Sequence, residues 1–351
     1  MAGAGHRAAE IAGSEGVVEG PLRGHHHETY VFPLPYPESG DPARWKIREP
    51  QPSRDWFDRK CFAGEEQLLM ALAGRVRSVP EVIQVESIPL QRFVEGETLG
   101  SRFQAGRAIP PHHLGQLMGV FRDLTAIDPE SLLVRRRCNP LDRAADGDSS
   151  GFLERLVVFS EENVYKRNLW AFGSLFRSLG LDQDCFGCLR KHVSGLQERP
   201  FHLLHGDLHR ENLIVDPQDR LWVIDWELAM FGDPLYDLAT HLYLMRYPHR
   251  QAHEVTARWA EAVENVRPGA SRGCTADLVR LVTFKWAQSV CTDVIRAVTA
   301  LQSGLTLPRA VQQVRKVLEA GAEPLGLDTV PTRRQTAAAL LWWKRQYAQD
   351  A

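Results

Sequence analysis

Residues 201–239 read FHLLHGDLHRENLIVDPQDRLWVIDWELAMFGDPLYDLA, and they decide how the rest of the chain is interpreted. Within them, two short apolar runs, residues 212–215 and 221–224, flank a turn of sequence DPQD at residues 216–219. Branched and aromatic residues on both sides of a turn that is rich in Pro and Asp are typical of a β-hairpin. The stretch therefore predicts two short antiparallel strands.

Three polar side chains meet at one edge of this predicted hairpin. Asp207 lies on the loop before the first strand, Asn212 opens that strand, and Asp225 ends the second. Phosphoryl transfer needs a carboxylate that takes the proton of the attacking hydroxyl, and oxygen ligands that hold magnesium against the phosphates. Magnesium takes few protein oxygens and keeps several waters, so one Asp and one Asn suffice. The arrangement predicts Asp207 as the catalytic base, with Asn212 and Asp225 as magnesium ligands.

The same pattern occurs in protein kinases, where the base Asp and the metal-binding Asn lie five residues apart and a second metal-binding Asp follows a hairpin. Here Asp207 and Asn212 have that spacing, and His205 occupies the place of the catalytic-loop His. The segments HGDLHRENLIV and VIDWELAMFGDPLYDLA resemble the aminoglycoside phosphotransferase family, which has HGD in place of HRD and Trp or Leu after the magnesium Asp. An ordinary hairpin with surface acids is the alternative.

The resemblance implies an α+β fold of the two-lobed protein-kinase-like type, with a small β-rich N-lobe and a large, mainly helical C-lobe. Residues 1–14 are rich in Ala and Gly, and we expect them to be flexible. Residues 15–95 would form the N-lobe, which binds ATP, and residues 96–351 the C-lobe. Three strands are expected between residues 17 and 50, and the loop at Gly24 would cover the phosphates, although it has few glycines.

A basic strand, residues 45–48, is expected to supply the cation that holds the phosphates. Strand alternation puts Lys46 and Arg48 on one face. The resembled family carries Arg at this point, which favours Arg48 and leaves Lys46 as its rival. The segment GEEQLLMALAGRV predicts a helix with leucines at helical spacing, ending near Gly74. The resemblance implies that Glu65 on this helix pairs with the cation, with Glu66 as the alternative.

The strand-like segment before Gly96 leads into the expected hinge between the lobes. There the backbone of residues 91–94, including Gln91, Phe93 and Val94, would bind the adenine edge. Residues 98–200 and those after 234 have mostly helical patterns with apolar stripes. We interpret Asp233 and Asp237 as structural acids that accept hydrogen bonds from backbone N–H groups.

The composition excludes several classes of protein. The net charge of −2 gives no field that favours nucleic acid. No 18-residue run is apolar enough for a membrane span, and no signal peptide is evident, so we expect a cytoplasmic protein. The six cysteines, which include a CxxC at Cys185 and Cys188, are too scattered for a disulfide scaffold, and we expect thiols. The oligomeric state remains open.

The predicted function is an ATP- and Mg²⁺-dependent phosphotransferase that moves the γ-phosphate to a hydroxyl of a small molecule. The resemblance favours an aminoglycoside or a related antibiotic, for which Glu227, Glu261, Glu264 and Asp293 are candidate acidic contacts. The alternatives are a kinase of a small metabolite of the choline, homoserine or sugar type, and a non-catalytic nucleotide-binding pseudokinase. A Ser/Thr protein kinase is disfavoured because DFG and APE segments are absent from the sequence.

Overall fold

The computed structural model describes residues 3–23, 27–36, 39–50, 57 and 59–347. The chain divides into two compact units, each built from three segments. Unit 1 comprises Met1–Cys138, His202–Phe231 and Leu244–Val266, and unit 2 comprises Asn139–Phe201, Gly232–Tyr243 and Arg267–Ala351. The lobe boundary predicted near residue 95 stays a prediction, because the compact units divide the chain along different lines.

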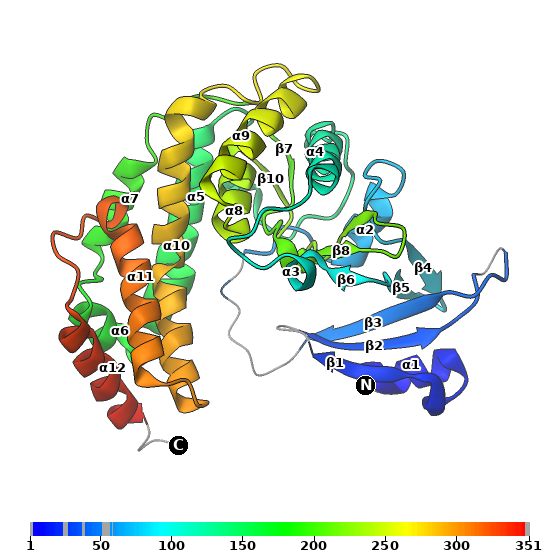
Figure 1. The fold of residues 1–351 in the computed structure, drawn as a ribbon, viewed down its shortest axis with the longest axis horizontal. Coiled ribbons are helices and arrows are strands. Elements are labelled where there is room, and N and C mark those ends of the chain that lie inside the picture. The colour runs from blue at the N-terminus through cyan, green and yellow to red at the C-terminus, as the bar shows by residue number, and fades with distance from the viewer. Residues whose placement is uncertain (1–2, 24–26, 37–38, 51–56, 58, 348–351) are drawn as a thin grey trace. The chain divides into compact units, whose positions relative to one another are not determined.

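Unit 1 contains a five-stranded antiparallel sheet in the order β1-β2-β3-β5-β4 (Figure 1). Three strands were expected between residues 17 and 50, and three are present. A hairpin of two further strands joins them at β3, and its two turn residues, Glu86 and Ser87, both have positive φ, as a tight hairpin turn requires. The strands are β1 Glu19–Arg23, β2 His27–Pro33, β3 Arg44–Pro50, β4 Val82–Val85 and β5 Ile88–Arg92.

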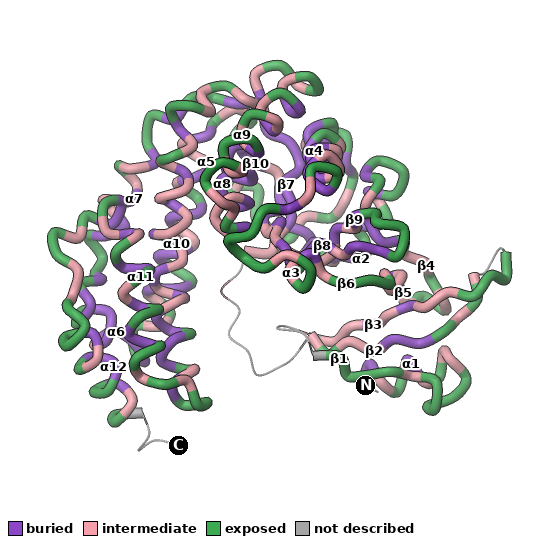
Figure 2. The backbone as a smooth tube through the Cα atoms, viewed as in Figure 1, coloured by how far each residue is buried: buried purple, intermediate pink, exposed green. Residues whose placement is uncertain are grey.

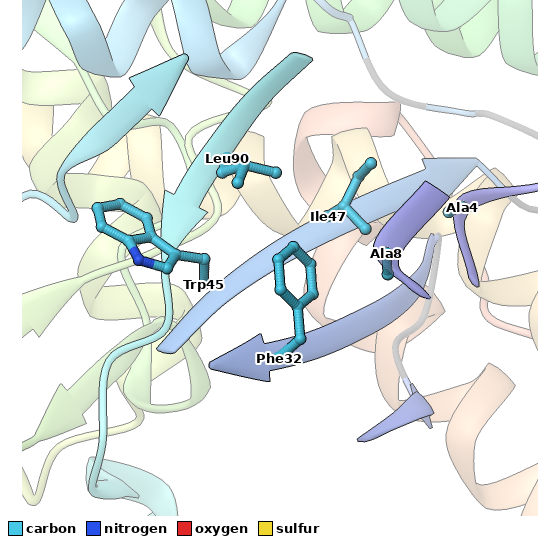
Figure 3. Close-up of a cluster of buried hydrophobic side chains, with 6 residues drawn as sticks. All are labelled: Ala4, Ala8, Phe32, Trp45, Ile47 and Leu90. Atoms are coloured by element: carbon cyan, nitrogen blue, oxygen red, sulfur yellow. The ribbon is translucent and has the colours of Figure 1, made fainter. Parts of the chain in front are cut away.

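One face of this sheet is covered by α1, Ala4–Ala12. Ala4 and Ala8 are buried against Phe32, Ile47 and the other apolar residues of the cluster in Figure 3. The prediction of a flexible N-terminus is therefore wrong for residues 4–12. The small residues that suggested a loose segment are what let the helix approach the sheet closely: a Cβ on Gly5 would lie 2.9 Å from the Tyr30 ring.

The opposite face of the sheet carries Lys46 and Arg48 and meets α2, Glu65–Leu72. This is the helix predicted from its leucine spacing, and Leu68, Leu69 and Leu72 are buried in it. Because Trp45 and Ile47 point into the apolar cluster, strand alternation turns both cations to the other side.

The decisive hairpin forms as predicted: β8, Leu213–Val215, pairs with β9, Leu221–Val223. Asn212 itself lies outside the strand, at the end of the 3₁₀ turn Arg210–Asn212. On its other side β8 pairs with β6, Glu97–Thr98. The loop before it follows β7, His202–Leu204, which pairs with β10, Met230–Gly232. Figure 2 shows that β7, β8 and β9 consist mostly of buried residues.

Helices complete both units. In unit 1, α4 packs on α9, and in unit 2, α10 and α11 lie side by side (Figure 1).

No helix in the described ranges is long and apolar enough to span a membrane. All six cysteines are thiols, as predicted. The remaining helices are 3₁₀ turns at Glu15–Val17, Pro140–Asp142 and Lys166–Asn168, a π-helix at Ser160–Tyr165, and α3 Leu99–Arg102, α4 Pro111–Thr125, α5 Ser149–Phe159, α6 Leu169–Ser178, α7 Asp184–His192, α8 Pro234–Met245, α9 His249–Glu264, α10 Cys274–Gln302, α11 Leu307–Leu325 and α12 Arg333–Tyr347.

A buried ion network holds unit 2 together. The Arg199 guanidinium, with no exposed surface, donates to Asp233 Oδ2 at 2.8 Å and to Asp277 Oδ2 at 2.8 Å. Asp233 also accepts a hydrogen bond from the Leu235 N–H at 2.8 Å at the start of α8, which confirms its predicted structural role. Asp237 is buried within the same helix. One cation thus neutralises the acids of two helices.

A tight backbone approach shapes the loop of residues 205–212. Gly206 has φ +78°, and a Cβ at this position would lie 2.6 Å from the Leu228 carbonyl oxygen. Only glycine adopts this conformation without strain and fits this space. The glycine of the HGD segment is therefore required by the fold of the loop that carries Asp207.

We expect Arg199→Met to lower the free energy of unfolding by about 3–5 kcal/mol, because it leaves the Asp233 carboxylate buried without a cation. The Asp277 carboxylate would keep Arg280, whose Nη1 lies 3.7 Å from Oδ1. Arg258→Ala, which breaks a partly exposed pair with Glu254 on α9, should cost less than about 1 kcal/mol. Urea unfolding measures both. Equal losses in the two variants would show that the buried network is not a principal stabilising element.

Gly206→Ala should lower the free energy of unfolding by at least about 1–2 kcal/mol, the cost of left-handed backbone for an L-residue, before the clash with Leu228 is added. The matched control is Gly187→Ala in α7, where a Cβ meets no atom within 4 Å. Removing a helical glycine there should stabilise the protein by about 1 kcal/mol. Melting curves that shift in the same direction for both variants would contradict the requirement for glycine at position 206.

Candidate functional site

A buried histidine fixes the loop that carries Asp207. His205 Nε2 lies 3.2 Å from the Ile224 carbonyl oxygen, and Nδ1 accepts the N–H of Asp207 at 3.2 Å. This pairing assigns the proton to Nε2 of a neutral ring. Burial lowers the pKa of His205 to about 4, so the ring stays neutral near pH 7. Its edge contacts Trp226, with ring centroids 4.7 Å apart.

Asp207 and Asn212 lie side by side, as the sequence predicted. Asn212 Nδ2 donates to the Asp207 main-chain oxygen at 2.9 Å and to carboxylate Oδ2 at 3.0 Å. His209 Nε2 lies 3.3 Å from the same Oδ2. Burial alone would lower the pKa of His209, but the hydrogen bond to Asp207 and the charges of Asp207, Asp225 and Glu211 together outweigh it, and the pKa is raised. Within the described ranges Oδ1 of Asp207 accepts no hydrogen bond, so only Oδ2 of the carboxylate has partners there.

Asp225 lies at the same end of the hairpin as Asn212. The N–H of Ile224 donates to the Asn212 carbonyl oxygen at 2.9 Å, which ties the two segments together. Asp225 itself has φ +63°, a left-handed conformation that is strained for a residue with a Cβ. The next N–H, that of Trp226, donates to Glu65 Oε1 at 2.9 Å. The backbone on both sides of Asp225 is therefore held.

Glu65 also pairs with Arg48, through Oε2 and Nη2. Glu66 Oε1 lies farther from the same nitrogen, at 4.0 Å, so of the two predicted acids Glu65 is the closer partner. Lys46 forms no ion pair within the described part of the chain. Burial, together with the charge of Arg48, lowers the pKa of Lys46 to about 7, although Asp225 and Glu66 act in the opposite direction. Lys46 is thus close enough to Asp225 to feel its charge, while Arg48 contacts Glu65.

Glu227 has a different environment from the one proposed for it as a substrate contact. Its Oε1 lies 3.0 Å from His27 Nε2, and its Oε2 lies 2.8 Å from Lys60 Nζ. Burial would raise the pKa of Glu227, but these two partners lower it to about 2. Sequence reasoning missed His27 and Lys60, since they come from segments far from Glu227 in the chain. Both carboxylate oxygens are committed within unit 1.

Oxygen donors for a cation gather at this end of the hairpin. One carboxylate oxygen from each of Glu65, Asp225 and Glu227 lies within 4.8 Å of the others, and Asn212 is adjacent. Hard oxygens in this arrangement fit Mg²⁺, which needs one or two protein carboxylates and completes its shell with water and phosphate. Glu65 and Glu227 already bind neighbouring groups through both oxygens, so of these three acids Asp225, the predicted ligand, is the one left for a metal ion.

The hinge residues are only partly available to a nucleotide. The N–H of Phe93 donates to the Arg44 carbonyl oxygen at 2.8 Å, so this donor is not free for an adenine, contrary to the expectation from the sequence. The Val94 N–H makes no hydrogen bond to any described residue. Gln91 is 2% exposed, and neither polar atom of its side chain has a partner in the described structure. Gly24 lies outside the described residues.

Arg210 is a supporting residue that the sequence did not reveal. It is buried, and its guanidinium donates to the carbonyl oxygens of Met245 at 3.0 Å, Phe103 at 2.6 Å and Arg107 at 2.7 Å. An arginine between His and Glu looks like an exposed charge, and no local signal reveals carbonyls contributed by segments far away in the chain. Arg210 fixes the loop between Asp207 and Asn212 to α3 and to the end of α8.

Comparison with known proteins gives a consistent result. The phosphotransferase enzyme family matches residues 39–271, which is more than half of the chain. A choline/ethanolamine kinase family protein from Mesorhizobium loti superposes with a TM-score of 0.54 at 16% identity, covering 96% of this chain and 97% of that one. Curated protein sequences yielded no match.

Two further solved structures are similar. A thermostable mutant of an aminoglycoside phosphotransferase, in complex with ADP and hygromycin B, has a TM-score of 0.53 at 15% identity and covers 93% of this chain and 99% of its own. A choline kinase from Streptococcus pneumoniae has a TM-score of 0.50 at 15% identity, covering 87% and 92%. These similarities confirm the predicted kinase-like α+β fold.

The family match includes β3, α2, the loop of residues 205–212 and the hairpin, which carry the cations, the acids and the amide described above. From this match we conclude that the chain belongs to the phosphotransferase enzyme family and is a small-molecule phosphotransferase.

Proposed function

We propose that the chain transfers the γ-phosphate of ATP to a hydroxyl group of a small molecule, with Asp207 as the base. The observation that supports this most directly is the state of the Asp207 carboxylate. Asn212 and His209 hold Oδ2, while Oδ1 accepts no hydrogen bond from the described residues. A base needs such an oxygen within hydrogen-bond reach of the proton that it takes. Asp207 would orient the hydroxyl and accept its proton as the oxygen attacks phosphorus.

The cations of β3 would hold the phosphates. Arg48 is the main candidate because its contact with Glu65 orients its guanidinium. Lys46 lies beside it with its pKa lowered to about 7 by burial, and nearby phosphate charge would favour its protonated form. Asn212 and Asp225 would hold Mg²⁺, which when bound neutralises charge on the β and γ phosphates.

The nucleotide would lie against the hinge. The N–H of Val94 is the donor that the sheet leaves unused among the predicted hinge residues, and the buried side-chain amide of Gln91 offers two further polar atoms. Phe93 has only its carbonyl to offer. The loop at Gly24 would cover the phosphates. The ADP in the similar aminoglycoside phosphotransferase structure supports a nucleotide substrate.

For the acceptor we propose an aminoglycoside or a related antibiotic, with a choline-type alcohol as the second candidate. The similar structures include a phosphotransferase in complex with hygromycin B and members of the choline kinase group. Glu227 is excluded as a primary contact for a cationic substrate because it already binds His27 and Lys60. Glu261, Glu264 and Asp293 remain candidates. ADP release that depends on the added acceptor separates both classes from a pseudokinase.

Asp207→Asn should lower kcat by a factor of about 10²–10⁴, the usual contribution of a general base, and leave ATP binding nearly unchanged. The measurement is ADP release with ATP and Mg²⁺ across a panel of aminoglycosides, choline, homoserine and sugars. Asp328→Asn, an exposed acid on the α11–α12 loop, is the control and should retain full activity. Near wild-type turnover in Asp207→Asn, with an acceptor that wild type uses, would remove Asp207 as the base.

Arg48→Met should reduce kcat/KM for ATP by about 10²-fold or more, because the phosphates of ATP lose a positive charge that is held in position next to them. Lys46→Met should have a smaller effect, since burial already disfavours the charge of Lys46. The melting temperature of each variant would distinguish an effect on the site from an effect on the fold. A larger kinetic loss in Lys46→Met than in Arg48→Met would exchange the two roles.

A further inference from the structure

Three side chains that could ligate a metal converge at the turn of the β8–β9 hairpin, at the opposite end of the hairpin from Asn212 and Asp225. His112 Nε2 lies 2.7 Å from Asp219 Oδ2, and His113 Nε2 lies 3.1 Å from Asp219 Oδ1. The ligand atoms of all three residues lie within 4.8 Å of one another. The histidines open α4, while Asp219 belongs to the hairpin turn, so the cluster joins segments about a hundred residues apart in the chain.

The turn is held in place without help from the histidines. Gln116, one helical turn farther along α4, donates through Nε2 to the Asp219 carbonyl oxygen at 3.0 Å. Its Oε1 accepts the N–H of Leu221 at 2.7 Å. The main chain at the end of the turn, from Asp219 to Leu221, is thus fixed to α4, and the Asp219 carboxylate lies beside His112 and His113. A preformed set of ligands binds a metal better than a set that must first be ordered.

The two imidazoles differ in their exposure to solvent. The His113 side chain is 2% exposed and its buried Nδ1 has no partner in the described structure, so its only polar contact is made by Nε2, which points at Asp219. The side chains of His112 and Asp219 are each 52% exposed. The cluster is therefore anchored on one side and open to water on the other, which provides an entry path and space for a water ligand.

The ligand set indicates which ion would bind. Two imidazoles and one carboxylate suit Zn²⁺ and similar transition metals, whereas Mg²⁺ prefers oxygen ligands alone. Ligands about 2.0–2.1 Å from a tetrahedral ion lie about 3.4 Å from one another. The two N···O separations, 2.7 and 3.1 Å, need to open only slightly to admit the ion. Arg102 Nη1, at 3.4 Å from Asp219 Oδ1, competes for the same carboxylate.

We propose that His112, His113 and Asp219 form a binding site for a transition-metal ion of the Zn²⁺ type, which fastens α4 to the turn of the hairpin that carries the reactive loop. The site is separate from the magnesium ligands and has a different ligand chemistry. It depends on no assumption about the phosphoryl acceptor. In its metal-free form the cluster joins the helix to the turn through the contacts of the two histidines with Asp219.

The test is isothermal titration of untagged, chelator-treated protein with ZnCl₂, without nucleotide or acceptor, together with melting curves. We expect one tight equivalent of Zn²⁺ and a raised melting temperature in the wild type. His112→Ala and Asp219→Asn, chosen because both residues are half exposed, should each lower the affinity for this Zn²⁺ ion by at least about tenfold. Co²⁺ should bind without a thiolate charge-transfer band, since the ligand set holds no cysteine.

Two control variants report where the ion binds. His253→Ala removes an exposed pair on α9, where His249 and His253 Nε2 atoms lie 3.2 Å apart, and it should leave the tight equivalent unchanged. Asp225→Asn should leave it unchanged as well. Loss of binding in either control, or no Zn²⁺ binding by the wild type at concentrations up to about 100 times the protein, would overturn the proposal. Because no turnover is measured, a failure of the phosphotransferase assignment would not alter these outcomes.

Discussion

The Glu65 carboxylate joins the two halves of the reactive centre. One oxygen contacts the guanidinium of Arg48 on β3, and the other accepts the N–H of Trp226, the residue after Asp225. A buried carboxylate is strongly unfavourable unless both of its oxygens are satisfied. Here it is satisfied only when β3, α2 and the end of β9 are in register. The relative placement of Arg48 and of the backbone next to Asp225 therefore follows from the contacts of a single side chain.

Around this link the site is built mainly from backbone hydrogen bonds. The Asn212 carbonyl accepts from Ile224, the carbonyl of Ile224 pairs with His205, and His205 accepts from the N–H of Asp207. The first two bonds join a residue before the hairpin to Ile224 at its end, and the third fixes Asp207 to His205 within the loop. Such a chain of bonds holds polar side chains at fixed positions, while Oδ1 of Asp207 accepts no hydrogen bond from the residues that the structure describes.

The parts that could be predicted from sequence are those whose signals are local. The hairpin, the α2 leucines and the alternation of Lys46 and Arg48 follow from short-range periodicity, and the structure contains all of them. The resemblance to a known family added the pairing of Arg48 with Glu65. The contacts that could not be predicted are made with partners distant in the chain. They are the ion pairs of Glu227 with His27 and Lys60, and the hydrogen bonds of Arg210 to three carbonyl oxygens. The N-terminal helix was missed because alanine and glycine by themselves indicate flexibility. Their value for close packing depends on the sheet, which the local sequence does not reveal.

The neutral state of His205 also connects the loop to acidity. In the unfolded chain a histidine takes up a proton near pH 6.5, whereas in the folded protein burial delays this to about pH 4. Between these values the unfolded state binds more protons than the folded state, so the stability due to this residue is complete above about pH 6.5 and is lost as the pH falls toward 4. Proton uptake would also break the acceptor bond from Nδ1 to the N–H of Asp207. In a compartment that acidifies, proton uptake by His205 would therefore lower the stability of the fold. The same residue holds Asp207 in place at neutral pH.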